Sequence, residues 1–114
     1  MHIQKIKGVV ILKLAAEDLS RPQETYKIVE QLLKRDGERC LVADLSELAD
    51  LVSIQAGALF ALHALCYENV AVLKLAAANK KVKLVLRLIG LDKIMELHHG
   101  REVALASFGS GEEE

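Results

Sequence analysis

A serine at the start of a long apolar stretch is the residue of this chain best placed for regulated chemistry. Ser53 follows a loop that carries Glu47 and Asp50, and small apolar residues follow it. The hydroxyl of a serine at a helix start can accept a backbone N–H group that is otherwise unpaired, so Ser53 could act only as a helix cap. Ser53 could also be phosphorylated, because the free N–H groups and the dipole of a helix N-terminus favour an anion. The sequence leaves both interpretations open.

The histidines and cysteines do not have the arrangement that catalysis or metal binding needs. His63 and Cys66 lie in the apolar stretch, where a core-facing histidine and thiol are expected instead of an exposed, activated thiolate. His98 and His99 are neighbours on a predicted strand, so they point to opposite faces and are expected at an exposed strand end. The sequence also has no glycine-rich phosphate-binding motif. We therefore predict that the protein is not an enzyme and binds no metal and no cofactor.

Composition narrows the class of protein further. The chain has 114 residues, which suits a single domain. Its formal net charge of -1 predicts no general attraction to nucleic acid or to anionic membranes. Every apolar run is shorter than the ~20 residues of a membrane-spanning helix, and the N-terminus does not have the pattern of a signal peptide. The two cysteines, Cys40 and Cys66, are expected to be buried and reduced. We expect a cytoplasmic protein without membrane insertion.

Strands and helices alternate along the chain that must position Ser53. Predicted strands cover residues 3–6, 9–14, 40–45, 70–76 and 94–98. Predicted helices cover residues 20–34, a segment from residue 53, residues 80–89 and a segment from residue 100. Residues 15–19 are expected to form a connection, and Ser20 and Asn79 are expected to cap the helices that follow them.

This order, β-β-α-β-α-β-α-β-α, implies a mostly parallel α/β sheet with an antiparallel edge strand and with helices packed on it. We predict one domain over residues 1–108 and a disordered acidic tail over residues 109–114. The helix from residue 53 is apolar nearly all round, so it is either deeply buried or leaves apolar surface for a partner. The basic residues between 80 and 87 are expected to form a solvated helix face, with an acidic partner or a nucleotide as the alternative.

Two segments give the chain a family resemblance. The first runs from Leu41 to Leu59 (LVADLSELADLVSIQAGAL) and is similar to a family pattern of strand, D-L-S, apolar loop and D-S-x-G-L-G. The second runs from Val85 to Leu97 (VLRLIGLDKIMEL) and is similar to V-L-x-L-x-G-L-D-K-I-F-x-I. Over nearly its whole length the chain resembles the STAS domains, and among them the bacterial anti-sigma factor antagonists.

The resemblance implies a function for the loop and the helix start. In phosphoregulated members a partner kinase phosphorylates the serine that opens the second helix, and Ser53 falls on that serine. Asp44, Ser46 and Gly57 match the family pattern as well. The resemblance therefore implies a protein-interaction module that binds a serine kinase or anti-sigma factor, with phosphorylation at Ser53 as the switch. The predicted partner-binding residues are Ser46, Glu47, Leu48, Asp50, Leu51, Val52, Ser53 and Ile54, with the four apolar ones as exposed anchors.

The residues around Ser53 depart from that pattern. Val52 stands where the family usually has aspartate, Ile54 where small residues are common, and Gln55 where the first glycine is usual. These bulkier neighbours favour an alternative, in which the chain is a scaffold that is not phosphorylated. It would then be a subunit of a stressosome-like or transporter-associated complex, and the sequence leaves its oligomeric state open.

Overall fold

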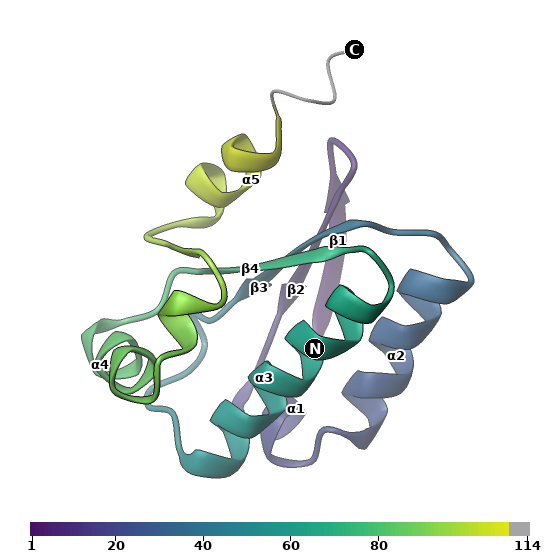
Figure 1. The fold of residues 1–114 in the computed structure, drawn as a ribbon. Coiled ribbons are helices and arrows are strands. Elements are labelled where there is room, and N and C mark those ends of the chain that lie inside the picture. Colours follow the sequence, from purple (N-terminus) through teal and green to yellow (C-terminus); the bar gives the residue numbers. More distant parts are fainter. Residues whose placement is uncertain (110–114) are drawn as a thin grey trace.

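The structure is a computed structural model that describes residues 1–109 (Figure 1). It contains one five-stranded sheet with the order β1-β2-β3-β4-β5. The strands are β1 (His2–Ile6), β2 (Val9–Lys13), β3 (Cys40–Asp44), β4 (Val72–Ala76) and β5 (Leu97–His98). β1 pairs with β2 in the antiparallel direction, and all the other neighbouring strands are parallel. The predicted α/β sheet with an antiparallel edge strand is confirmed.

A two-residue turn joins β1 to β2. Lys7 and Gly8 both have positive φ angles, of 51° and 82°. A turn with positive φ at both positions has the twist that joins antiparallel strands, and glycine adopts this conformation at no steric cost. The register pairs Ile6 directly with Val9, so the hairpin that Gly8 predicts is present.

Helices cover both faces of the sheet (Figure 1). One face carries α1 (Ala16–Ser20), α2 (Gln23–Lys34), α3 (Ser53–Glu68) and α4 (Lys80–Ile89), and the other carries α5 (Arg101–Gly109). Neighbouring residues of the central strands alternate between the two cores: Leu12 and Leu41 lie in the larger one, Ile11 and Val42 in the smaller one. This double covering explains why these strands are apolar at successive positions. Gly109 closes α5, and the rest of the predicted tail lies outside the described residues.

Residues 15–19, predicted as a connection, instead lead into and form most of the short helix α1. The N–H group of Ala15 donates to Oδ2 of Asp18 at 2.8 Å, which fixes the first turn. Leu19 is fully buried in the larger core. A single helical turn buries too few residues to show an apolar period, so the sequence pattern does not reveal it.

Ser20 is not the cap of α2, and that prediction is wrong. α2 begins at Gln23, is preceded by Pro22, and has no side-chain cap. The Ser20 hydroxyl instead accepts a hydrogen bond from Nε2 of Gln55 at 3.0 Å. The hydroxyl oxygen of Ser20, which the local sequence pattern predicts as the cap of α2, is therefore bonded to a residue far along the chain instead.

The last strand is shorter than predicted. A 3-10 turn, η1 (Leu91–Lys93), follows α4, and the N–H groups of Ile94 and Met95 both donate to the carbonyl of Leu91. Residues 94 and 95 are therefore not part of a strand, and β5 contains only two residues. No helix within residues 1–109 has both the length and the apolar character needed to cross a bilayer.

The fourth strand starts two residues later than predicted. Val70 has a φ of 56°, which breaks an extended conformation. The next N–H group, of Ala71, donates back to the carbonyl of Cys66 at 2.8 Å and closes the end of α3. β4 therefore begins at Val72.

Candidate functional site

Asp44, at the end of β3, fixes where the predicted binding loop begins. Its Oδ1 accepts the N–H group of Ser46 at 2.9 Å, and its Oδ2 accepts Nη2 and Nε of Arg101 at 2.7 and 3.2 Å. Nη1 of Arg101 also donates to Oε1 of Gln4 at 2.8 Å. Burial alone would raise the pKa of Asp44, but the hydrogen bonds from Arg101 and Ser46 outweigh it and hold the pKa below its usual value. The ionised carboxylate thus ties the loop to β3 and α5.

The loop folds inward over the end of the sheet. Leu48 and Leu51 are only 2% and 4% exposed and belong to the larger core. Their predicted role as exposed anchors is therefore wrong. The physical reason is that the loop, rather than a helix, covers this end of the core, so its leucines supply the apolar contacts there.

Asn79 holds this inward conformation. Its Nδ2 donates to the carbonyls of Leu48 and Ala49, both at 3.1 Å. Its Oδ1 accepts the N–H group of Val82 at 2.8 Å, which confirms the predicted cap of α4. One amide side chain therefore joins the loop before α3 to the start of α4.

Ser53 is the first residue of α3 and does not cap it. The preceding Val52 occupies the cap position, and Oε1 of Gln55 accepts the Val52 N–H group at 3.0 Å. Nε2 of Gln55 donates to Ser20, so the same side chain fastens α3 to α1. Ser53 is exposed, and its hydroxyl makes no hydrogen bond within residues 1–109. The interpretation of Ser53 as a side-chain cap is therefore wrong, and the hydroxyl is accessible.

Apolar side chains surround Ser53. Val52 and Ile54 are 48% and 60% exposed, as predicted for anchors. Beside them is a hollow of about 400 Å³ between α3 and α4, whose lining includes Ser53, Phe60, Ile89 and Ile94. The sequence analysis did not find the contribution of Ile89 and Ile94, because α4 and η1 reach α3 only through the tertiary fold.

Charged side chains form the edge of this surface. Glu47 lies 3.6 Å from Nζ of Lys13, and Asp50 lies 4.0 Å from Nζ of Lys81. All four groups are at least one-third exposed, so these pairs are solvated and contribute little to stability. Together with exposed Ser46, the predicted polar residues therefore remain available to a partner.

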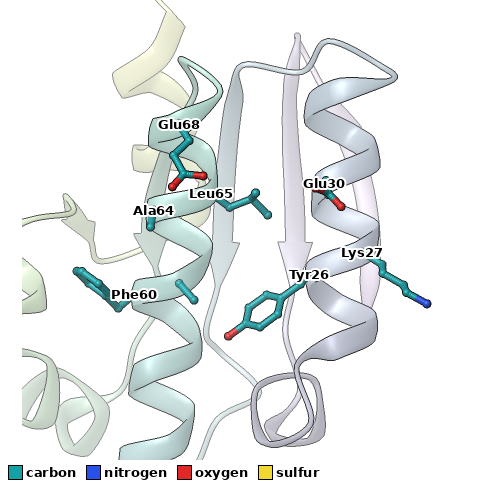
Figure 2. A pocket seen from close by; sticks show the side chains of 8 residues that line it. Tyr26, Lys27, Glu30, Phe60, Ala64, Leu65 and Glu68 are labelled. Atoms are coloured by element: carbon teal, nitrogen blue, oxygen red, sulfur yellow. The ribbon is translucent and has the colours of Figure 1, made fainter.

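A second groove lies between α2 and α3 (Figure 2). Its volume is about 500 Å³, and Tyr26 of α2 and Leu65 of α3 extend toward each other across it. Charged residues at its edge, Glu30 and Glu68, come from the two different helices. Burial raises the pKa of Tyr26, so its hydroxyl stays protonated. The groove offers apolar contact but no nucleophile beside a base.

His63 and Cys66 do not form a nucleophile pair. His63 is half-buried, with its ring centroid 6.3 Å from those of Phe60 and Tyr67. Cys66 is 1% exposed. Nε2 of His98 contacts Oε1 of Glu96 at 2.9 Å, and the described part of the chain contains no cluster of three residues able to hold a metal.

Cys66 is expected to be inert toward thiol reagents in the native protein. Burial raises the pKa of its thiol to about 11, so very little reactive thiolate is present at mildly alkaline pH. In a Cys40→Ser background, mass spectrometry should find Cys66 unmodified by iodoacetamide in buffer and fully modified in urea. Similar rates in the two solutions would show that the thiol is accessible in the folded chain.

Comparisons with known proteins identify solved structures that have a similar fold. Neither the protein-family models nor the curated proteins include a match. A chain of the stressosome, a signal integration and transduction hub, aligns with a TM-score of 0.78 at 19% identity over 93% of this chain and 94% of that one. A Thermotoga maritima protein described as an anti-sigma factor antagonist aligns with a TM-score of 0.73 at 20% identity, over 93% of this chain and 92% of that one. An anti-sigma factor antagonist from Mycobacterium paratuberculosis aligns with a TM-score of 0.70 at 19% identity, over 93% of this chain and 90% of that one. These likenesses establish a common fold.

Proposed function

We propose that this chain, which has the fold of the STAS domains, is a cytoplasmic protein-interaction module similar to an anti-sigma factor antagonist. The observation that carries the proposal is an exposed apolar surface around an exposed serine. Val52 and Ile54 project from the start of α3 beside the hollow that Phe60, Ile89 and Ile94 line. Apolar side chains next to a hollow and inside a polar edge are typical of a protein-binding surface. The partner we propose is a serine kinase or anti-sigma factor, and the chain itself has no catalytic role.

Phosphorylation of Ser53 is the proposed switch. Its hydroxyl is exposed and has no hydrogen bond to break within residues 1–109, so a kinase could reach it at little cost. A phosphate would add about -1.5 to -2 charges. The N-terminus of α3 would tolerate this anion, so the fold would persist. A partner that packs on Val52 and Ile54 would instead meet charge within an apolar contact, and its affinity would fall.

A constitutive scaffold is the second candidate function, and Gln55 favours it. This residue stands where the family has a glycine, and it is only 5% exposed. Its side chain bonds to the Val52 N–H group and to Ser20, which fixes the start of α3 in one conformation. A rigid helix start of this kind suits a permanent contact within an assembly.

We expect Ser53→Asp to abolish partner binding and Ser53→Ala to preserve it. The test is a pull-down with the wild type and both variants from the source organism's lysate, read by quantitative mass spectrometry. Ala106→Asp, which places the same charge at an exposed position of α5 on the opposite face of the sheet, is the matched control. Ile54→Arg should also abolish binding if the apolar surface is the contact.

Three results separate the candidates. Loss of a kinase-like protein with Ser53→Asp and Ile54→Arg, but not with Ala106→Asp, supports the switch. Equal capture by wild type and Ser53→Asp, with loss in Ile54→Arg, supports the constitutive scaffold. Capture that Ile54→Arg does not change would show that the contact lies elsewhere.

A further inference from the structure

β5 leaves more than half of β4 without a paired strand at the edge of the sheet. β5 pairs only with Leu75 and Ala76, so the first three residues of β4 have no neighbouring strand on that side. A notch of about 520 Å³ opens there, between α3, β4 and the segment that precedes β5. The residues that line it include His63, Tyr67, Val72, Leu73, Lys93 and Ile94.

The backbone N–H and C=O groups of Leu73 face this notch. The N–H group of Val72 donates to the carbonyl of Arg39 on the β3 side, at 2.9 Å, and that of Leu75 donates to the carbonyl of Glu96 on the β5 side, at 2.8 Å. Because N–H and C=O groups alternate in direction along a strand, those of Leu73 face away from β3, as those of Leu75 do. Within residues 1–109 neither group of Leu73 has a hydrogen-bond partner.

An unpaired backbone pair at this position is unusual. Leu73 is only 2% exposed, and nearly all buried backbone N–H and C=O groups in proteins have a partner. The two groups of Leu73 lie at the floor of the notch, so only a segment that enters the notch can reach them. A donor and an acceptor on the same residue match the acceptor and donor of another peptide backbone. A carboxylate or a cation would satisfy only one of the two groups. The site is therefore complementary to an extended peptide.

The side chains around the notch specify the peptide further. Tyr67, Val72 and Ile94 are about half exposed or more, and together they offer apolar contact. Lys93 is exposed and forms no ion pair in the described part of the chain. The other lysine of the notch, Lys74, is already bonded to Glu96 at 3.2 Å and to Ser107 at 2.7 Å. The free charge therefore favours an acidic residue.

We propose that the notch binds an extended segment of a partner protein, which adds to β4 as a short strand and hydrogen-bonds to both backbone groups of Leu73. The segment has an apolar side chain for the notch and an aspartate or glutamate beside it for Lys93. This site adjoins the surface around Ser53, since Ile94 lines both, but it has its own α3 residues, His63 and Tyr67, which lie in the C-terminal half of that helix.

The test uses a phage-displayed library of short random peptides, panned on the full chain and in parallel on Val72→Arg. Val72→Arg places a charged side chain at the uncovered edge of β4, where the peptide would add, and changes none of the residues that line the hollow beside Ser53. Val103→Arg, a similar change at a partly exposed position of α5, is the matched control. Circular dichroism confirms that each variant is folded. The most enriched peptide is then synthesised, with and without N-methylation of its central residues, and titrated into ¹⁵N-labelled chain.

The proposal predicts peptides that combine an apolar and an acidic residue and that shift the amide resonance of Leu73. Affinity should fall at least about tenfold with Val72→Arg, with Lys93→Glu and on N-methylation, and should persist with Val103→Arg. Absence of enrichment over an unrelated protein, or peptides that bind Val72→Arg equally, would overturn it. It would also be overturned if Val72→Arg abolishes self-association of the chain, or if removal of residues 110–114 shifts the Leu73 resonance. The occupant would then be a second copy or the chain's own C-terminal residues.

Discussion

Replacement of Leu48 by alanine is expected to lower the free energy of unfolding by about 2–5 kcal/mol, the usual range for a buried leucine. Leu48 is 2% exposed and packs in the larger core. Its backbone carbonyl also accepts a hydrogen bond from Asn79, so the loop cannot easily collapse into the cavity that alanine leaves. Urea denaturation followed by circular dichroism measures the change.

The control for this experiment is Val52→Ala in the same loop. Val52 is 48% exposed, so the free energy of unfolding should change by no more than about 0.5 kcal/mol. The effect on partner affinity should be reversed: Val52→Ala should weaken binding more than Leu48→Ala, because Val52 lies in the surface that we propose and Leu48 is buried. Equally small stability changes in both variants would mean that Leu48 is exposed in solution, as the sequence pattern predicts.

Replacement of Arg101 by glutamine is expected to lower the free energy of unfolding by about 3 kcal/mol at neutral pH, near the lower end for a broken buried ion pair. The side chain of Asp44 is 5% exposed, and that of Arg101 is 25% exposed. The variant leaves the Asp44 carboxylate buried without its cation, while the exposure of the arginine moderates the loss. Arg21→Gln is the control, since Arg21 pairs with Glu17 at 3.7 Å with both groups exposed.

The pH dependence of this loss has a definite sign. The hydrogen bonds from Arg101 and Ser46 hold the pKa of Asp44 below its usual value in the folded chain. Stabilisation by the pair is therefore complete above the ordinary aspartate pKa of about 3.9, and it disappears as the pH falls through the folded-state pKa. The difference between wild type and Arg101→Gln should shrink below about pH 4. A difference that stays constant in acid would exclude Asp44 as the group that Arg101 stabilises.

The sequence alone predicts the elements whose signals are local. The successive apolar residues of β3 indicate a strand covered on both faces, and the two cores confirm it. Asn79 and Gly90 mark the two ends of α4, where the asparagine accepts the Val82 N–H group and the glycine has a φ of 82°. Each of these features depends on neighbours within a few residues, so pattern is sufficient to find it.

The candidate site is less predictable because tertiary contacts decide it. Leu48 has the sequence context of an exposed loop residue, but the fold buries it in the larger core. Gln55 takes a partner, Ser20, that is 35 residues away. The same bond removes Ser20 from the cap of α2, so one long-range contact overturns a local prediction at its other end. The exposure of Val52 and Ile54 was predicted correctly, because no other element covers these two side chains.

The bonds of Arg101 also set the order in which this domain can be completed. Arg101 joins Gln4, 97 residues before it, and Asp44, 57 residues before it. During synthesis, β1, β3 and the turn at Ser46 all leave the ribosome long before α5 exists. Asp44 has its counter-charge only after residue 101 has emerged, so the entry to α3 lacks its final support until then. A nascent chain would therefore present the Ser53 surface in its mature form only after α5 has been synthesised, which would protect a partner from capture by shorter, incomplete chains.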